Sequence, residues 1–266
     1  MSRLTVFAKG NLDVRDTLHS QKIGNRVAWN GINEILRARA PPAVARVQHE
    51  TWTRSDALLL SDGTVPPELA RHAPTLDPYS AASQFSHALF ATRADVIALS
   101  VHPDINTTLL RHKRDGYLFY PYQRQSWRKD ALDWLQDNFE DIGLLDPETS
   151  MANLVRTISR IRQGSNPAIL IYNVSSVVPG EKLHAYDGLD EALSTRIRRF
   201  NLGLIEVSRQ TGISLIDVDR IVAEEGANRM KYDFRHLTSE GCRVVAEEVV
   251  RVLDDLGYLA SATGDQ

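Results

Sequence analysis

The C-terminal part of the chain contains the segment Lys231-Tyr-Asp-Phe-Arg-His-Leu-Thr-Ser-Glu-Gly241, from which much of the architecture can be inferred. After this segment, apolar residues recur with helical spacing at Val245, Val249, Val252, Leu253 and Leu256. Thr238 fits the N-cap of the helix, and Glu240 falls in its first turn, where the helix dipole favours a negative charge. We therefore expect a short polar loop that is held in place by a C-terminal helix packed on the core.

Two residues of this segment, Asp233 and His236, form the first candidate site. They are three positions apart, so their side chains can meet within one short loop. A carboxylate beside an imidazole fixes its tautomer and stabilises the imidazolium, which is what a general base needs. A solvated loop could carry the same two residues without any function, because Asp-x-x-His is a common pattern. Our hypothesis is that the pair is catalytic.

Short apolar runs alternate with helical patterns along the chain, which is typical of an α/β protein. Strands are expected at residues 4–8, 44–52, 95–101, 168–174 and 213–217. Helices are expected at residues 25–40, 81–92, 127–139, 147–162 and 189–211. This alternation favours a mainly parallel sheet that is covered by helices on both faces. One domain is expected over residues 1–266, with a flap or insertion at residues 63–80 and 107–128.

Composition narrows the class of protein. The 266 residues are 42% hydrophobic and 24% charged, which is ordinary for a globular chain. A net charge of −3 gives no reason to expect nucleic acid or an anionic membrane as a partner. Cys242 is the only cysteine, so no intramolecular disulfide can form, and no apolar run is long enough for a signal peptide or a membrane span. We expect a cytoplasmic protein that acts on a small molecule, and its oligomeric state stays open.

Motifs for cofactors are missing from the sequence. It contains neither Gly-x-Gly-x-x-Gly nor the phosphate-binding Gly-x-x-x-x-Gly-Lys-Ser/Thr, so the nucleotide-binding classes lack their usual support. His102 and Asp104, with His87 or His112, could be considered as metal ligands. Their spacing matches no established metal motif, and structural roles are favoured. We therefore expect no cofactor and no metal.

Polar residues follow several of the expected strands. Ligands bind at the carboxyl ends of the strands in sheets of this kind. Lys9 and Asn11 follow the first strand, and Asp104 and Asn106 follow the third. These four residues, together with Arg15, are the expected substrate-binding residues. Residues 111–128 mix basic and aromatic side chains, which would form either an anion-binding mouth or a loop packed on the body.

At this point the chain resembles the SGNH, or GDSL-like, hydrolase family over nearly its full length. The matching parts are Asp233-Phe-Arg-His236 with Leu-Thr-Ser-Glu-Gly241 after it, the strand Ala168-Ile-Leu-Ile-Tyr-Asn-Val-Ser175, and Leu215-Ile-Asp-Val-Asp219. The resemblance implies a three-layer α/β/α sandwich with a mainly parallel central sheet. It also implies an esterase or acyltransferase with a Ser-His-Asp triad, in which His236 is the general base and Asp233 its partner.

Two other parts of the family pattern differ in this chain. Where the family has Gly-Asp-Ser with the nucleophilic serine, this chain has Gly10-Asn11-Leu12, and a leucine cannot attack a substrate. The central Gly-x-Asn-Asp block corresponds to Val101-His-Pro-Asp-Ile-Asn106, which has no glycine. The nucleophile could instead be Thr17, in an Arg-Asp-Thr-Leu echo of the motif, or Ser20. Alternatively, His236 could act on the substrate without a covalent step.

The expected function is therefore that of an SGNH-like esterase or acyl-transfer enzyme for a small polar or glycan-type substrate. Its base pair is His236 with Asp233. The alternative is a catalytically divergent protein of the same fold that binds a polar or anionic ligand without covalent hydrolase chemistry, because fold alone does not determine activity.

Overall fold

The computed structural model describes residues 3–23, 26–72, 80–181 and 191–259. Part of the expected flap at 63–80 and the beginning of the helix expected at 189 lie outside the described residues. None of the helices in the described ranges is both long and apolar enough to cross a membrane.

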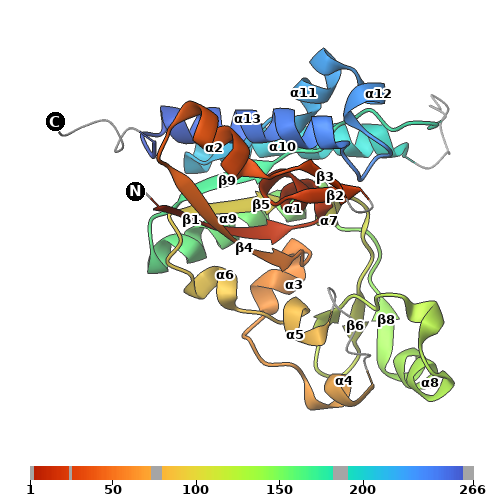
Figure 1. The fold of residues 1–266 in the computed structure, drawn as a ribbon. Helices are drawn as coiled ribbons and strands as arrows, with labels where there is room; N and C mark the ends of the chain where they lie inside the picture. Colours follow the sequence, from red (N-terminus) through yellow and green to blue (C-terminus); the bar gives the residue numbers. More distant parts are fainter. Residues whose placement is uncertain (1–2, 24–25, 73–79, 182–190, 260–266) are drawn as a thin grey trace.

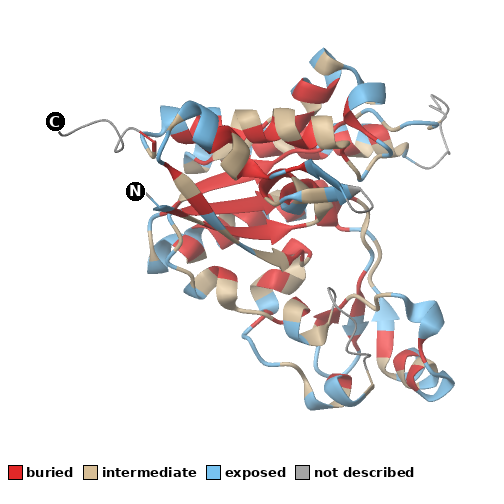
Figure 2. Ribbon diagram, in the orientation of Figure 1, coloured by how far each residue is buried: buried red, intermediate tan, exposed pale blue. Residues whose placement is uncertain are grey.

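The core of the fold is a five-stranded parallel sheet in which every strand is short and apolar. Its order is β10-β9-β5-β1-β4, so the first strand lies between the second and the third. These strands are β1 (Arg3–Gly10), β4 (Val44–Thr51), β5 (Val96–Ser100), β9 (Ala168–Tyr172) and β10 (Ser214–Ile216). All four pairings are parallel, and Figure 2 shows the strands buried in the centre of the molecule. The five strands that the apolar runs predict are confirmed.

Helices cover both faces of this sheet, because successive strand residues point to opposite sides and both sides are apolar. One face packs against α1 (Leu12–Leu18), α2 (Ile32–Arg39), α11 (Val218–Glu225), α12 (Ala227–Met230) and α13 (Ser239–Asp255). The other packs against α3 (Ser55–Leu60), α6 (Ala88–Ala91), α9 (Pro147–Gly164) and α10 (Leu193–Thr211). Figure 1 shows α2 and α13 above the sheet and α3 and α6 below it. The three-layer α/β/α architecture is confirmed.

A smaller lobe projects from the body below the central sheet (Figure 1). It contains α4 (Pro67–His72), α5 (Ala81–Gln84), β6 (Leu110–His112), β7 (Leu118–Phe119), the 3-10 turn η1 (Arg124–Ser126), α8 (Lys129–Asn138) and β8 (Phe139–Asp141). The three strands form an antiparallel sheet of order β7-β6-β8. The lobe has a separate apolar cluster, made of Leu69, Phe85, Leu110, Phe119, Trp127, Ala131, Leu135 and Phe139.

One buried arginine holds the lobe to the body. The side chain of Arg54 is 1% exposed, and its Nη1 donates to the carbonyl oxygens of Thr107 at 2.8 Å and Gly143 at 2.7 Å. The same guanidinium makes a two-point ion pair with Asp56. Residues 107 and 143 flank the part of the lobe that carries β6, β7, α8 and β8, so a single guanidinium fixes both ends of this segment.

Two helix predictions differ from the structure. The helix expected from residue 25 starts later, because residues 26–29 form β3 (Arg26–Trp29), which pairs with β2 (Gln21–Ile23). The helix expected at 81–92 is split into α5 and α6. The hydroxyl of Ser61 donates to the carbonyl oxygens of Phe85 and Ser86, so these acceptors point away from a helix axis. The pairing of β3 with β2 and the hydrogen bonds of Ser61 join separate parts of the chain, so the local periodicity of the sequence does not predict them.

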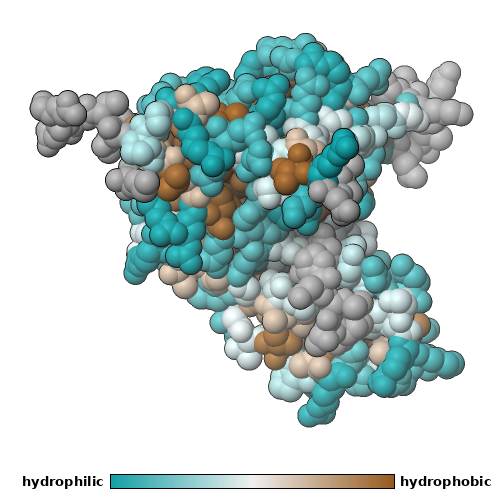
Figure 3. Space-filling model, in the orientation of Figure 1, coloured by the Kyte–Doolittle hydropathy of each residue, from teal (hydrophilic) through white to brown (hydrophobic). Residues whose placement is uncertain are grey.

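The surface in the view of Figure 3 is largely hydrophilic, with hydrophobic side chains in small separate patches over the body and the lobe. Such scattered apolar residues are normal for a globular protein and indicate no extended apolar docking face on this side.

The packing of α13 allows a direct test. A Cβ at Gly241 would collide with the backbone carbonyl of Met230, whose oxygen also accepts the Thr238 N–H at 2.8 Å. We expect Gly241→Ala to lower the free energy of unfolding by about 1–3 kcal/mol, because backbone atoms cannot move aside cheaply. Urea unfolding at 25 °C measures the effect.

Gly164→Ala is the matched control, since a Cβ there makes only ordinary contacts at 3.6 Å or more, at the end of α9. Equal stabilities for the two variants would contradict the close approach of α13 to Met230.

Candidate functional site

The strand order creates a place where ligands bind in α/β sheets. The chain leaves β1 toward β4 on one side and reaches β5 on the other, so the topological switch point lies between β1 and β5. Asn11 follows β1 directly, and His102 begins α7 (His102–Asn106) just after β5. The loop that contains Asp233 and His236 joins α12 to α13 on the same edge of the molecule, and Arg235 of this loop lines a hollow with Asn11 and His102.

The candidate base pair has the geometry that a general base requires. Nδ1 of His236 lies 2.7 Å from Oδ2 of Asp233. The other carboxylate oxygen, Oδ1, accepts the backbone N–H groups of Arg235 at 2.7 Å and His236 at 2.8 Å. Partial burial alone would raise the pKa of Asp233, but these hydrogen bonds outweigh it and lower the pKa. The carboxylate is therefore both fixed in direction and ionised.

Further contacts at the ends of the loop hold it in shape. The backbone N–H of Tyr232 donates to the carbonyl of His236 at 2.9 Å, and Lys231 forms an isolated antiparallel bridge with Leu237. The Thr238 hydroxyl accepts the N–H of Gly241 at 3.0 Å, which confirms the predicted N-cap of α13. Both candidate side chains are about half exposed, so they are available to a ligand.

An open cleft of about 200 Å³ lies between the body and the lobe, and Arg235 of the loop lines it, whereas Asp233 and His236 are not among its lining residues. We call it the open cleft; its lining residues are Asn11, Trp52, His102, Pro103, Asn106, Thr107, Thr108, Tyr120, Tyr122 and Arg235. Two expected substrate-binding residues, Asn11 and Asn106, are among them. The lining combines amide, hydroxyl and aromatic groups with one cation, which suits a polar ligand.

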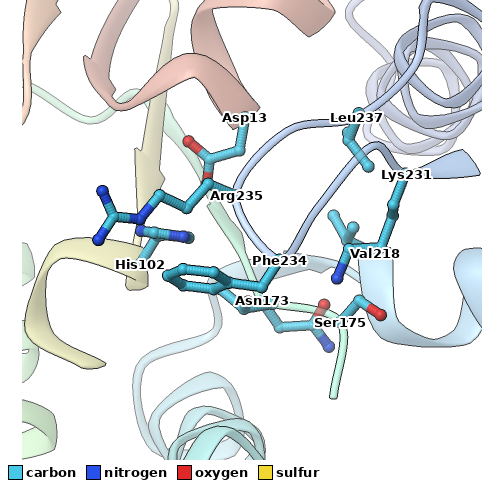
Figure 4. A pocket seen from close by; sticks show the side chains of 10 residues that line it. Asp13, His102, Asn173, Ser175, Val218, Lys231, Phe234, Arg235 and Leu237 are labelled. Carbon is cyan, nitrogen blue, oxygen red and sulfur yellow. The ribbon is translucent and has the colours of Figure 1, made fainter. Parts of the chain in front are cut away.

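A narrower pocket of about 20 Å³, the inner pocket, shares His102 and Arg235 with the open cleft. Its polar lining groups are Asp13, His102, Asn173, Ser175, Lys231 and Arg235. In the view of Figure 4, Asp13, His102 and Arg235 gather on one side, and Lys231 and Ser175 on the other. Burial lowers the pKa of Lys231 to about 8, although the charges of Asp219 and Asp233 act in the opposite direction. The pocket is large enough for a water molecule rather than for a substrate.

Two of the expected substrate-binding residues, Lys9 and Asp104, have partners inside the protein. Lys9 is buried and pairs with Glu50 at 3.1 Å, and burial lowers its pKa despite this partner. Asp104 is buried and accepts the N–H of Ser55 at 2.8 Å and the hydroxyl of Ser150 at 2.6 Å. Burial dominates these two hydrogen bonds and raises the pKa of Asp104 to about 6. Both residues line a small cavity of about 20 Å³, which shares Trp52 and Pro103 with the open cleft.

The remaining expected residues are not brought to the cleft. Arg15 is exposed and pairs with its neighbour Asp16 at 2.8 Å. Thr17 is fully buried, and its hydroxyl donates to the carbonyl of Asp13 at 2.6 Å, so it cannot reach a substrate as a nucleophile. Ser20 is exposed beyond the end of α1.

Several residues of the two hollows were missed by the sequence analysis. The sequence pattern suggests His102 only as a metal ligand, although its place directly after an apolar strand is a signal for a site residue. Arg235 is next to His236 in the sequence, and Asp13 lies two residues from Asn11 and from Arg15, but no sequence pattern singles out either residue. Within the described part of the chain, no group of three or more His, Cys, Asp or Glu side chains could hold a metal ion.

The mixed segment 111–128 contributes its rings rather than its charges. Arg111 pairs with Glu140 at 3.6 Å, and Arg114 pairs with Asp115 and Glu68, all at exposed positions. Tyr120 and Tyr122 line the open cleft. The cation of this cleft is Arg235, which comes from the loop before α13.

Comparison with known proteins gives a clear result only at the level of structure. No protein-family model and no curated protein matches the sequence. A lipase/acylhydrolase from Enterococcus faecalis matches with a TM-score of 0.51 at 12% identity, over 96% of this chain and 97% of its own. The acetyl xylan esterase AlAXEase matches with a TM-score of 0.51 at 11% identity, over 94% of this chain and 100% of its own. An acetylxylan esterase from Geobacillus stearothermophilus matches with a TM-score of 0.50 at 11% identity, over 93% of each chain. At these identities the likeness shows a shared fold.

The raised pKa of the buried Asp104 can be tested through the pH dependence of stability. Its pKa is raised in the folded protein from 3.8 to about 6, so the stability that it contributes is present at low pH and is lost as the pH rises toward 6. The Asp104→Asn variant cannot ionise at this position, so its stability does not fall for this reason as the pH rises. We expect the stability of this variant relative to the original protein to improve between about pH 4 and pH 7, by on the order of 2–3 kcal/mol.

Urea unfolding across this pH range measures the difference, and Asp130→Asn, at an exposed helix position, controls for the loss of one carboxylate. A difference for Asp104→Asn that does not change with pH would contradict the effect of burial.

Proposed function

We propose that this chain, which has the fold of the SGNH hydrolases, hydrolyses or transfers an acyl ester of a small polar or glycan-type molecule. His236 is the general base, Asp233 is its orienting partner, and a bound water or acceptor hydroxyl replaces the protein nucleophile. The observation that carries this proposal is the 2.7 Å contact of His236 with Asp233, whose second oxygen is held by two backbone N–H groups. These hydrogen bonds fix the orientation of the imidazole, and a general base must be held in a fixed orientation to transfer a proton.

The hydrogen bond to Asp233 selects the tautomer of His236, and this tautomer decides which nitrogen can act as the base. A proton on Nδ1 of His236 donates to Asp233, which leaves Nε2 as the acceptor, and Nε2 makes no hydrogen bond to a described residue. Nε2 takes a proton from water as the water oxygen bonds to the acyl carbon. The imidazolium is stabilised by the Asp233 carboxylate and then gives its proton to the departing alkoxide. An acceptor hydroxyl in place of water would give acyl transfer.

The substrate class is inferred from the open cleft. The lining of the cleft includes the amide residues Asn11 and Asn106 and the hydroxyl residues Thr107 and Thr108, which suits a polar substrate better than a fatty chain. Arg235 contacts the face of Phe234 at 4.9 Å and makes no ion pair with a described residue. A guanidinium in this position would bind a carboxylate or another anionic group of the substrate.

A second candidate function is ligand binding without turnover, and Leu12 is the observation that favours it. The position that holds the nucleophilic serine in the family pattern carries an apolar side chain here. In this case the open cleft would still bind a polar or anionic ligand, and His236 would contribute only a hydrogen bond.

The two candidates differ in the effect of His236→Ala on turnover of p-nitrophenyl acetate. We expect kcat/KM to fall by at least about 10², because the base is lost, and Asp233→Asn to lower it in the same direction. His87→Ala, at the N-cap of α6, is the control and should keep full activity. A change of less than about threefold for His236→Ala would support ligand binding instead.

Leu12→Ser tests how completely the rest of the family site is retained. It places a hydroxyl at the start of α1, at the position that the resemblance assigns to the nucleophile. We expect this variant to gain fluorophosphonate labelling at residue 12 and to lose it again when His236→Ala is added. The original protein and Leu12→Ala should remain unlabelled at this position. If Leu12→Ser stays unlabelled, residue 12 and His236 do not meet as the family pattern implies.

A further inference from the structure

One wall of the open cleft carries aromatic rings, which the proposed reaction itself does not require. Trp52 follows β4, and Tyr120 and Tyr122 follow β7 in the lobe. The ring centroids of Trp52 and Tyr120 are 5.0 Å apart, and those of Tyr120 and Tyr122 are 6.3 Å apart. Such spacings are typical of rings in contact, so the three side chains form one surface. We call these three residues the aromatic wall.

Buried side chains fix the tyrosines of the aromatic wall through the backbone. Gln84 is 7% exposed; its Oε1 accepts the N–H of Tyr120 at 2.8 Å, and its Nε2 donates to the carbonyl of the same residue at 3.0 Å. Nε1 of the buried Trp127 donates to the carbonyl of Tyr122 at 2.9 Å. Both tyrosines remain partly exposed and line the cleft. The wall is therefore held in place before any ligand arrives, which lowers the cost of binding.

The backbone directly after Tyr122 adopts a disfavoured conformation. Gln123 has a φ of 47°, in the left-handed region, and no other non-glycine residue in the described ranges has a positive φ. This conformation is costly for a residue with a Cβ. Residues in such conformations cluster at ligand sites, where the surrounding contacts hold them. The lobe thus has a strained turn next to a residue that it presents to the cleft.

Arg235 brings a positive charge to the same cleft from the loop before α13. In Figure 4 its guanidinium points away from Lys231. Burial raises the pKa of Tyr120, and the charge of Arg235 acts in the opposite direction, so the guanidinium lies near this phenol. Aromatic rings alone also bind cationic ligands, but a neighbouring guanidinium repels them. The same guanidinium can bind a carboxylate through two parallel hydrogen bonds.

We propose that the aromatic wall and Arg235 form a subsite for the pyranose ring of an acidic sugar, that is, a sugar that carries a carboxylate. This inference rests on the proposed function and specifies its substrate. One face of the sugar packs on the wall, since its C–H groups are attracted to the negative face of an aromatic ring. The carboxylate pairs with Arg235, and the sugar hydroxyl groups form hydrogen bonds with cleft residues such as Asn106 and Thr108.

The polar residues of the cleft favour a sugar over other ring-shaped anions. An aromatic carboxylate would also stack on the wall, but the edge of its ring makes no hydrogen bonds. Its binding would remove water from Asn106, Thr107 and Thr108 without replacing the hydrogen bonds that are lost, which is unfavourable. Sugar hydroxyl groups both donate and accept, so they can replace that water.

Isothermal titration calorimetry with matched pairs of sugars tests the subsite. Methyl β-D-glucuronide and methyl β-D-galacturonide carry the carboxylate, whereas methyl β-D-glucoside and methyl β-D-galactoside have a hydroxymethyl group in its place. We expect at least one uronide to bind about tenfold or more tightly than its neutral counterpart, because the pair with the guanidinium is lost with the carboxylate. Benzoate and choline should bind more weakly than that uronide.

Variants assign the two parts of the subsite. Arg235→Gln, at an exposed position, should remove the preference for the uronide over its neutral counterpart. Tyr122→Leu should weaken the binding of both by about three- to tenfold. Arg128→Gln removes an exposed cation that does not line the cleft, and it should keep the original affinities. Should Tyr122→Leu fail to fold, saturation-transfer nuclear magnetic resonance on the original protein replaces it, and the ring C–H protons of the bound uronide should receive the strongest transfer.

The outcomes separate this inference from the proposed function. If neither uronide binds with a Kd below about 10 mM, or if the preference for the uronide survives Arg235→Gln, the subsite is overturned, whereas turnover of p-nitrophenyl acetate that depends on His236 still supports the proposed function. Equal or tighter binding of benzoate or choline also overturns the subsite. If the ester is not turned over but a uronide binds as expected, the proposed function fails and the subsite stands as that of a sugar-binding protein.

Discussion

Parallel pairing of β1 on both of its edges is the constraint on which the rest of this structure depends. β1 pairs with β4 over eight residues, from Arg3 opposite Val44 to Gly10 opposite Thr51, and with β5 from Val6 to Lys9. Because the strands are parallel, their carboxyl ends meet at one edge, and the chain must turn away from that edge in different directions. The open cleft, the inner pocket and the stacked rings of His102 and Phe234 all lie where these turns diverge.

The architecture could be predicted from the sequence because its signals are local. The apolar runs of the five strands, the period of α9 and the N-cap of α13 each depend on residues within one or two turns of each other. The same holds for Asp233 and His236, which are three residues apart and need only one loop to meet. Local patterns identify these features, since tertiary contacts reinforce them rather than override them.

The rest of the site depends on contacts between distant parts of the chain. Lys9 follows β1 as a ligand-binding residue would, yet Glu50 pairs with it from the neighbouring strand. Asp104 follows β5, yet it accepts hydrogen bonds from Ser55 and Ser150, which are 49 and 46 residues away. Conversely, His102 is buried and Arg235 reaches the cleft because the loop before α13 packs against the carboxyl end of β5. None of this is encoded in residue spacing, so a position at a strand end predicts proximity to a site but not a role in it.

The buried Arg54 has a consequence for how the molecule is organised. Its guanidinium holds Thr107 and Gly143 through the same nitrogen, so the two ends of the segment that carries β6, β7, α8 and β8 lie side by side. A segment with adjacent ends can change in length without altering the path of the chain that carries it, and α4 and α5 pack against this segment from an earlier part of the chain. The lobe supplies Tyr120 and Tyr122 to one wall of the cleft, whereas the loop before α13 contains the hydrogen-bonded Asp233 and His236. One wall of the cleft and the loop of Asp233 and His236 therefore come from different segments of one chain.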